Sequence, residues 1–133
     1  MATGQAASHI TEAAILNATF RVGGSTYYLA LFTVKPDDSN VGGTEVAGNA
    51  YARQAIAFSA PVAKTPSGSE IANSGVITYP VATGNWGTVA YFGLFDAATS
   101  GNMLAVDALT PSIVVNDTNQ VTFPIGAIII GVD

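Results

Sequence analysis

The stretch that most constrains the fold runs from Trp86 to Leu109, WGTVAYFGLFDAATSGNMLAVDAL. Its first ten residues are rich in β-branched and aromatic side chains, residues 96–102 supply turn chemistry, and residues 103–109 are apolar again. This pattern predicts two antiparallel strands joined by a loop. Within residues 88–95 both alternating sets of side chains are apolar, so we expect this strand inside a sheet that is covered on both faces.

Two further segments, residues 27–34 and 125–132, have the same two-sided apolar character. Shorter strands are predicted at residues 51–59, 76–81, 112–115 and 120–123. Pro111 is expected to interrupt the chain, and an edge strand is expected near Ile71 within an irregular segment. Seven to eight strands separated by Gly and Pro turns are typical of an all-β fold, an antiparallel β-sandwich or jelly-roll-like domain.

A short N-terminal helix is predicted to begin after Ser8, which can cap it, with Glu12 near the positive end of the helix dipole. Gly23 and Gly24 are expected to end it. The side chains expected to share one face are Ile10, Ala13, Ala14, Asn17 and Phe20. Residues 1–7 are small and polar and are interpreted as a flexible arm, and residues 8–133 as a single β-sandwich domain.

The three doubly apolar strands raise a packing problem, because a two-layer sandwich hides only one face of each sheet. One short helix cannot shield three strands. We therefore expect a second subunit to cover part of them, in a homodimer or homotrimer.

Charge is unusually sparse: Asp, Glu, Lys and Arg make up 10% of the chain, against about 25% in ordinary soluble domains. The net charge is -5, and four scattered cations cannot form the positive stripe that nucleic acid requires. The chain has no cysteine, which excludes disulfides and thiolate catalysis. We expect no targeting segment and no membrane span, because the densest apolar run, residues 125–132, is far shorter than the ~20 residues that a membrane helix needs.

Catalytic and metal-binding patterns are weak. His9 is the only histidine, with no carboxylate or serine fixed beside it, and is interpreted as solvated. Asp37, Asp38 and Asn40 form the nearest thing to an oxygen cluster, but they lack calcium-loop spacing and favour a turn. A pair of carboxylates for glycoside hydrolysis stays open, because nothing singles out a pair among nine acids. We predict no enzyme activity, no cofactor and no metal.

Partner contact is predicted at Tyr51 and Arg53, which share the non-core face of their strand, where a cation and an aromatic ring can anchor a protein. The alternative is an ordinary exposed sheet face. The long loop at residues 37–49 is a second candidate, through Asp37, Asp38 and Asn40. The side chains predicted to anchor the core are Tyr27, Leu29, Phe32, Phe58, Trp86, Tyr91, Phe92 and Phe95. For Trp86, core packing is favoured over stacking on a sugar ring.

Three segments of the chain resemble a family of small all-β structural proteins of tailed bacteriophages. They are YYLALFTVKPDD at residues 27–38, GTEVAGNAYARQAIAFSAP at residues 43–61 and TGNWGTVAYFGLFDAATSGNMLAVDAL at residues 83–109. Members of this family are described as tail fibre components or as capsid decoration proteins. The resemblance implies a virion protein and transfers no catalytic residue.

Between these two roles, the sequence favours a capsid decoration, or cement, protein. A fibre subunit usually has a long shaft with repeats or heptads, and none is visible in 133 residues. We expect such a protein to bind the major capsid protein on the outer capsid surface of virions assembled in the host cytoplasm, and to stabilise the assembled shell. The alternative is a tail fibre or tail-tip component that binds a host receptor or glycan.

Overall fold

The computed structural model describes residues 8–64 and 68–132. Contacts divide the chain into two compact units. Unit 1 comprises Met1–Ser25, Ala57–Val76 and Phe123–Asp133, and unit 2 comprises Thr26–Ile56 and Ile77–Thr122. The predicted N-terminal arm lies outside the described residues, and the prediction of a single domain stays a prediction.

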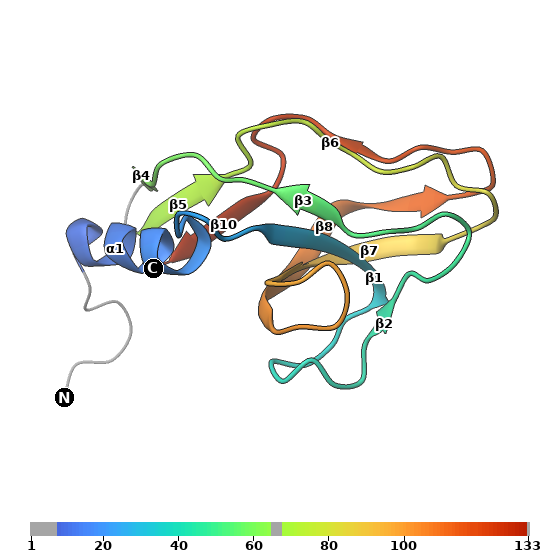
Figure 1. Ribbon diagram of the computed structural model, residues 1–133, viewed down its shortest axis with the longest axis horizontal. Coiled ribbons are helices and arrows are strands. Elements are labelled where there is room, and N and C mark those ends of the chain that lie inside the picture. The colour runs from blue at the N-terminus through green and yellow to red at the C-terminus, as the bar shows by residue number, and fades with distance from the viewer. Residues whose placement is uncertain (1–7, 65–67, 133) are drawn as a thin grey trace. The chain divides into compact units, whose positions relative to one another are not determined.

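Unit 2 is built on an antiparallel sheet in which β1 (Tyr27–Val34) and β7 (Gly87–Phe95) are the inner strands. β8 (Met103–Val115) pairs with the far side of β7 (Figure 1). The free side of β1 pairs with two short strands, β3 (Gln54–Ile56) at one end and β2 (Thr44–Glu45) at the other. A separate two-stranded sheet joins β6 (Ile77–Thr78) to β9 (Thr122–Phe123).

Both faces of β1 are buried over residues 29–32, as the two-sided apolar pattern predicts. On one face Leu29 lies opposite Leu94 in β7, and on the other Ala30 lies opposite Gly93. The last four residues of β7 are likewise all buried. Residues 29–32 of β1 and 92–95 of β7 therefore need no second subunit to cover them, and the expected homodimer or homotrimer stays a prediction.

Gly93 allows two phenyl rings to pack on the face that it shares with Ala30. The rings of Phe32 and Phe95 are stacked with their centroids 6.2 Å apart. A Cβ at Gly93 would lie 2.9 Å from a ring carbon of Phe32 and 3.1 Å from one of Phe95. The packing of these two rings therefore explains why residue 93 is a glycine.

β8 is longer than predicted and continues past Pro111. The pairing of β7 with β8 shifts register between Val89, which lies opposite Ile113, and Tyr91, which lies opposite Ala108. Pro111 lies in the stretch of β8 between these pairs, where the missing amide hydrogen removes no ladder bond. The irregularity lets the strand continue where an interruption was predicted.

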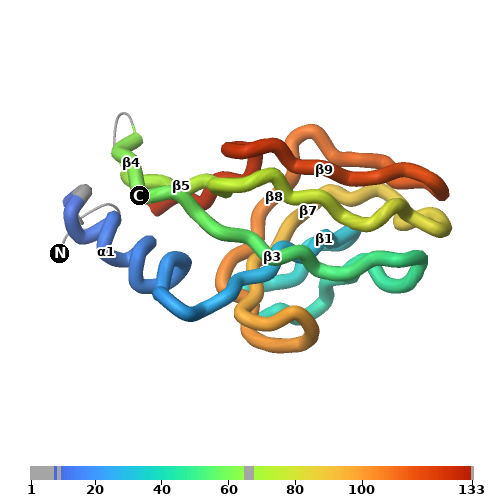
Figure 2. Tube along the Cα trace, turned by 45° about the horizontal axis from the view of Figure 1, so that its top comes forward, coloured from blue at the N-terminus to red at the C-terminus, as the bar shows by residue number. Residues whose placement is uncertain are grey.

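Unit 1 contains a three-stranded antiparallel sheet with β5 (Ser69–Ala72) between β10 (Ile129–Val132) and β4 (Val62–Ala63). The helix α1 (His9–Phe20) packs on β5 (Figure 2). The strand near Ile71 is thus central, and the prediction of an edge position is wrong. The predicted strand at 125–132 is shortened because Asn73 binds the preceding turn, through its carbonyl to the Gly126 amide (3.0 Å) and through Oδ1 to the Ile128 amide (2.9 Å).

The start of α1 is confirmed, since Ser8 is the N-cap and its hydroxyl accepts a hydrogen bond from the Thr11 amide. The side chains predicted to share one face differ in burial, and among them only Phe20 is buried. Ile10 is 84% exposed, whereas Glu12, Leu16 and Phe20, which follow one another at the four-residue spacing of one helix face, are buried. The Glu12 carboxylate is accommodated there because it accepts a hydrogen bond from the hydroxyl of β5 residue Ser69 (3.2 Å).

The described part of the chain is mostly β-structure with one short helix and several antiparallel sheets, which confirms the predicted fold class at this level. Ten strands lie within residues 8–64 and 68–132, more than the seven to eight expected, because several irregular segments form two-residue strands. A jelly-roll or sandwich arrangement of the sheets stays a prediction. In the described residues, no helix has the length and apolar character needed to cross a membrane.

Candidate functional site

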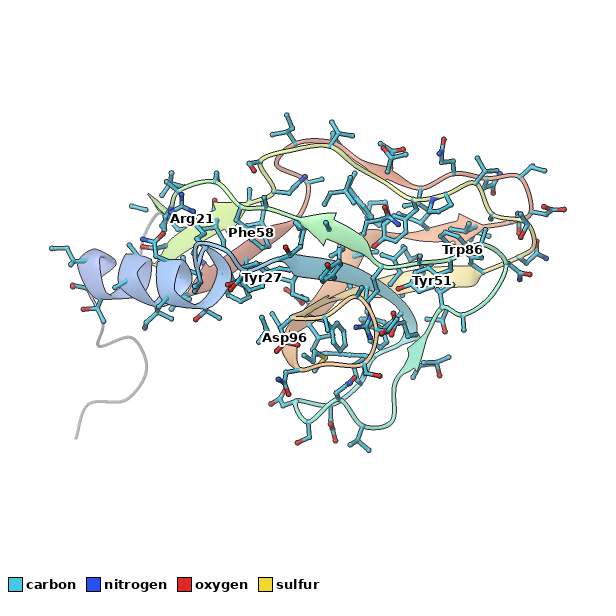
Figure 3. The ribbon with its side chains drawn as sticks, viewed as in Figure 1. Arg21, Tyr27, Tyr51, Phe58, Trp86 and Asp96 are labelled. Atoms are coloured by element: carbon cyan, nitrogen blue, oxygen red, sulfur yellow. The ribbon has the colours of Figure 1, made fainter. Side chains whose placement is uncertain are left out.

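The predicted core anchors lie inside, with one exception. Seven of the eight are buried, and Tyr91 in β7 is half-buried. The Trp86 side chain is buried, and its indole N–H donates to the Asn49 carbonyl oxygen (2.9 Å). Its ring lies edge-on to the ring of Tyr51, with centroids 5.4 Å apart (Figure 3). Trp86 therefore packs in the interior of unit 2.

The Glu45 carboxylate is the centre of a polar cluster in unit 2, which we call the Glu45 network and define as Glu45, Tyr51 and Arg53. Oε1 of Glu45 accepts from Nη2 of Arg53 (2.8 Å), and Oε2 accepts from Nε of Arg53 (2.9 Å). Oε2 also accepts from the Tyr51 hydroxyl (2.7 Å). The two hydrogen bonds from Arg53 form a bidentate ion pair, which is the strongest geometry for a guanidinium and a carboxylate.

Arg53 joins the Glu45 network to the loop that connects β7 to β8. Its Nη1 donates to the carbonyl oxygens of Ala97 (3.0 Å) and Ser100 (2.8 Å). Its guanidinium carbon lies 3.8 Å from the centroid of the Phe95 ring, a cation–π contact. The side chain is only 8% exposed. Its hydrogen bonds to Glu45 are the main cause that raises the pKa of Arg53 above its ordinary value, so the cation persists at every accessible pH.

Tyr51 connects the Glu45 network to the core. Its hydroxyl accepts a hydrogen bond from the Leu31 amide of β1 (3.0 Å), and its ring stacks on Tyr79 with centroids 6.0 Å apart. The Tyr79 hydroxyl donates to the Leu29 carbonyl oxygen (2.6 Å). Burial is the main cause that raises the pKa of both tyrosines, so both hydroxyls stay neutral. They serve as hydrogen-bonding groups and are poor candidates for nucleophiles.

The loop that Arg53 holds is also closed by Asp96. One carboxylate oxygen accepts from the Asn102 amide (2.7 Å), and the other accepts from the Asn102 side chain (2.9 Å). These hydrogen bonds, the backbone one first, lower the pKa of Asp96 below its ordinary value. The loop between β7 and β8 is thus fixed at its base and along its length.

A hollow of about 450 Å³ opens beside the Glu45 network. We call it the Glu45 hollow, and it is lined by Glu45, Val46, Ala47, Gly48, Tyr51, Ala52, Arg53, Ala98, Thr99 and Ser100. One wall belongs to the segment between β1 and β3, and the other belongs to the loop between β7 and β8. The charged groups in its lining are the paired Glu45 and Arg53, so the lining carries no net charge.

The structure places the two groups of predicted contact residues in different surroundings. Tyr51 and Arg53 belong to the Glu45 network, whereas Asp37, Asp38 and Asn40 are exposed in the turn after β1. One Asp37 oxygen accepts from the amides of Ser39 and Val41, both at 2.9 Å, as expected of a carboxylate that closes its own turn. As partner contacts all five stay predictions.

Sequence reasoning missed Glu45 as the partner of Arg53. A signal was present, because Glu45 precedes Tyr51 and Arg53 by six and eight residues in the segment GTEVAGNAYAR. In the described residues, no group of three His, Cys, Asp or Glu side chains is placed to hold a metal ion.

Comparison with known proteins gives one family. Residues 6–131 match a family model described as "Podophage GP4 fiber I protein gp80". Comparison with curated proteins gives no match. The matched residues contain the whole Glu45 network and nearly the whole chain, and they confirm the resemblance to structural proteins of tailed bacteriophages.

Proposed function

The chain belongs to this podophage fibre protein family, and we propose that it is a structural subunit of a tail fibre. The observation that carries the proposal is the match to a fibre family over residues 6–131. A family of virion structural proteins places its members in the virion, and a fibre family favours the tail over the capsid surface.

We further propose that the protein is not an enzyme. The chemistry of the Glu45 network supports this, because the acid and the cation that could act in catalysis neutralise each other at 2.8 Å. Tyr51 and Tyr79 keep their protons, since burial raises the pKa of each. No cofactor is required by this role.

As partners we propose further copies of the chain, together with other fibre proteins. Exposed apolar side chains on α1, among them Ile10 and Ile15, support self-association because burial of such surface is favourable. The scarcity of cations disfavours nucleic acid as a partner.

The capsid decoration role is the competing proposal. It rests on the absence of shaft repeats, on the sparse charge and on strands that were expected to need cover from a second protein. The last of these reasons is weakened, because residues 29–32 of β1 and 92–95 of β7 are buried in one copy. Binding to the major capsid protein therefore has less support than attachment at the tail.

The test is to locate and count the protein in purified virions. We expect gold-labelled antibodies to bind at the tail, and quantitative mass spectrometry to find few copies for each copy of the major capsid protein. Near-stoichiometric copies spread over the head would overturn the fibre proposal and support capsid decoration.

A further inference from the structure

We propose that the Glu45 hollow binds a neutral sugar residue of a glycan. For the biological source of that glycan, a host surface, the inference rests on the proposed fibre function. The volume of the Glu45 hollow, about 450 Å³, lies within the range of roughly 300–1,000 Å³ that is usual for small-ligand sites.

The charge of the lining selects a neutral ligand. An anion would meet the Glu45 carboxylate, which is 26% exposed, and a cation would meet the Arg53 guanidinium. Because the two groups are paired at 2.8 Å, neither is available as an isolated charge to attract a counter-ion. The other lining residues are uncharged.

The remaining hydrogen-bonding capacity suits hydroxyl groups. A guanidinium has five N–H donors, and Arg53 uses four of them: Nε, one on Nη2 and two on Nη1. Oε1 of Glu45 accepts one bond, and a carboxylate oxygen can accept two. The network thus retains one donor and one acceptor on neighbouring atoms. Adjacent sugar hydroxyls, each of which both donates and accepts, match that pair.

The walls of the Glu45 hollow are held before any ligand arrives. Arg53 binds the carbonyl oxygens of Ala97 and Ser100, and Asp96 binds Asn102 across the base of the same loop. A site whose walls are already ordered loses less conformational entropy on binding. Weak binding by one copy would then be strengthened by the repetition of subunits in a fibre.

The experiment is titration of the ¹⁵N-labelled full chain with single sugars, followed by two-dimensional amide NMR. The neutral probes are glucose, galactose, mannose and N-acetylglucosamine, and the charged probes are glucuronic acid and glucosamine. We expect at least one neutral sugar to cause saturable shifts at the amides of residues 46–48 and 98–100. Shifts with charged probes alone, or at other residues, or with none of the probes, would overturn the proposal.

Two variants test whether the hollow is the site. Ala98→Trp places a large side chain at an exposed lining position outside the hydrogen bonds of the Glu45 network, and should weaken binding about tenfold or more. Thr99→Trp repeats the test at the next residue if the first variant does not fold. Ala127→Trp, at an exposed alanine of unit 1, is the matched control and should bind as the wild type does. Binding unchanged in a folded Ala98 or Thr99 variant would contradict the assignment.

The sugar result and the virion result are independent. If the protein proves to lie on the capsid and still binds a neutral sugar in the hollow, the fibre proposal fails and the binding site stands. If it lies at the tail and no neutral sugar binds, the fibre proposal stands and the binding site fails.

Discussion

Arg53→Ala removes the residue on which the Glu45 network depends, and it should destabilise the protein by about 3 kcal/mol. Breaking a fully buried ion pair costs roughly 3–5 kcal/mol of stability. The cost is lower here because Glu45 is partly exposed, so water can solvate its carboxylate once Arg53 is removed. Loss of the contact with the Phe95 ring adds about 1 kcal/mol. Two loop carbonyls also lose a charged donor.

The assay is urea unfolding followed by circular dichroism, supported by thermal melts. For a chain of this length, a loss of about 3 kcal/mol lowers Tm by about 10 °C. Arg53→Lys keeps the charge without the two-pronged geometry and should lie between the wild type and the alanine variant. Arg21→Ala is the control, since Arg21 is exposed and should contribute less than about 1 kcal/mol. An Arg53→Ala variant as stable as the Arg21→Ala control would refute the reasoning.

Three further changes test other parts of unit 2. Gly93→Ala should cost about 1–3 kcal/mol in urea unfolding, because its Cβ would displace two buried phenyl rings from their stacked positions. Asp96 has a lowered pKa in the folded protein, so its contribution to stability is present above the ordinary value near pH 3.9 and is lost as the pH falls through the folded pKa. The Asn102 amide resonance should follow that titration, and in Asp96→Asn it should not. Trp86→Phe removes the donor to the Asn49 carbonyl and should cost about 1–2 kcal/mol by thermal melt, and an unchanged Tm would show that the hydrogen bond contributes nothing.

Local chemistry accounts for the elements that the sequence predicts correctly. The strands around Leu29 and Leu94 are evident because apolar side chains occupy both alternating sets. The start of the helix is evident because Ser8 satisfies a helix amide that has no other partner in its turn. Each of these features is decided by residues within a few positions of one another.

The candidate site is different, because its residues come from segments far apart in the chain. Alternation predicts that Arg53 lies on an outer face of its strand, whereas its guanidinium donates hydrogen bonds to Glu45, Ala97 and Ser100. Alternation indicates which residues of a strand share a face. It contains no information on the loop between β7 and β8, whose residues contact Arg53 from 44 and 47 positions later in the chain. The Glu45 hollow could not be predicted from the sequence, because its two walls come from segments that are far apart in the chain.

Short-range pattern and family motifs are sufficient to predict that the chain is β-rich, that its helix begins after Ser8, and that it resembles phage structural proteins. Three other features follow from the folded chain alone: which face of the helix is buried, the central position of β5, and the burial of residues 29–32 of β1 on both faces in one copy. These outcomes depend on contacts between distant segments. Burial is a property of everything that packs on a residue, and a linear pattern records only the residue itself.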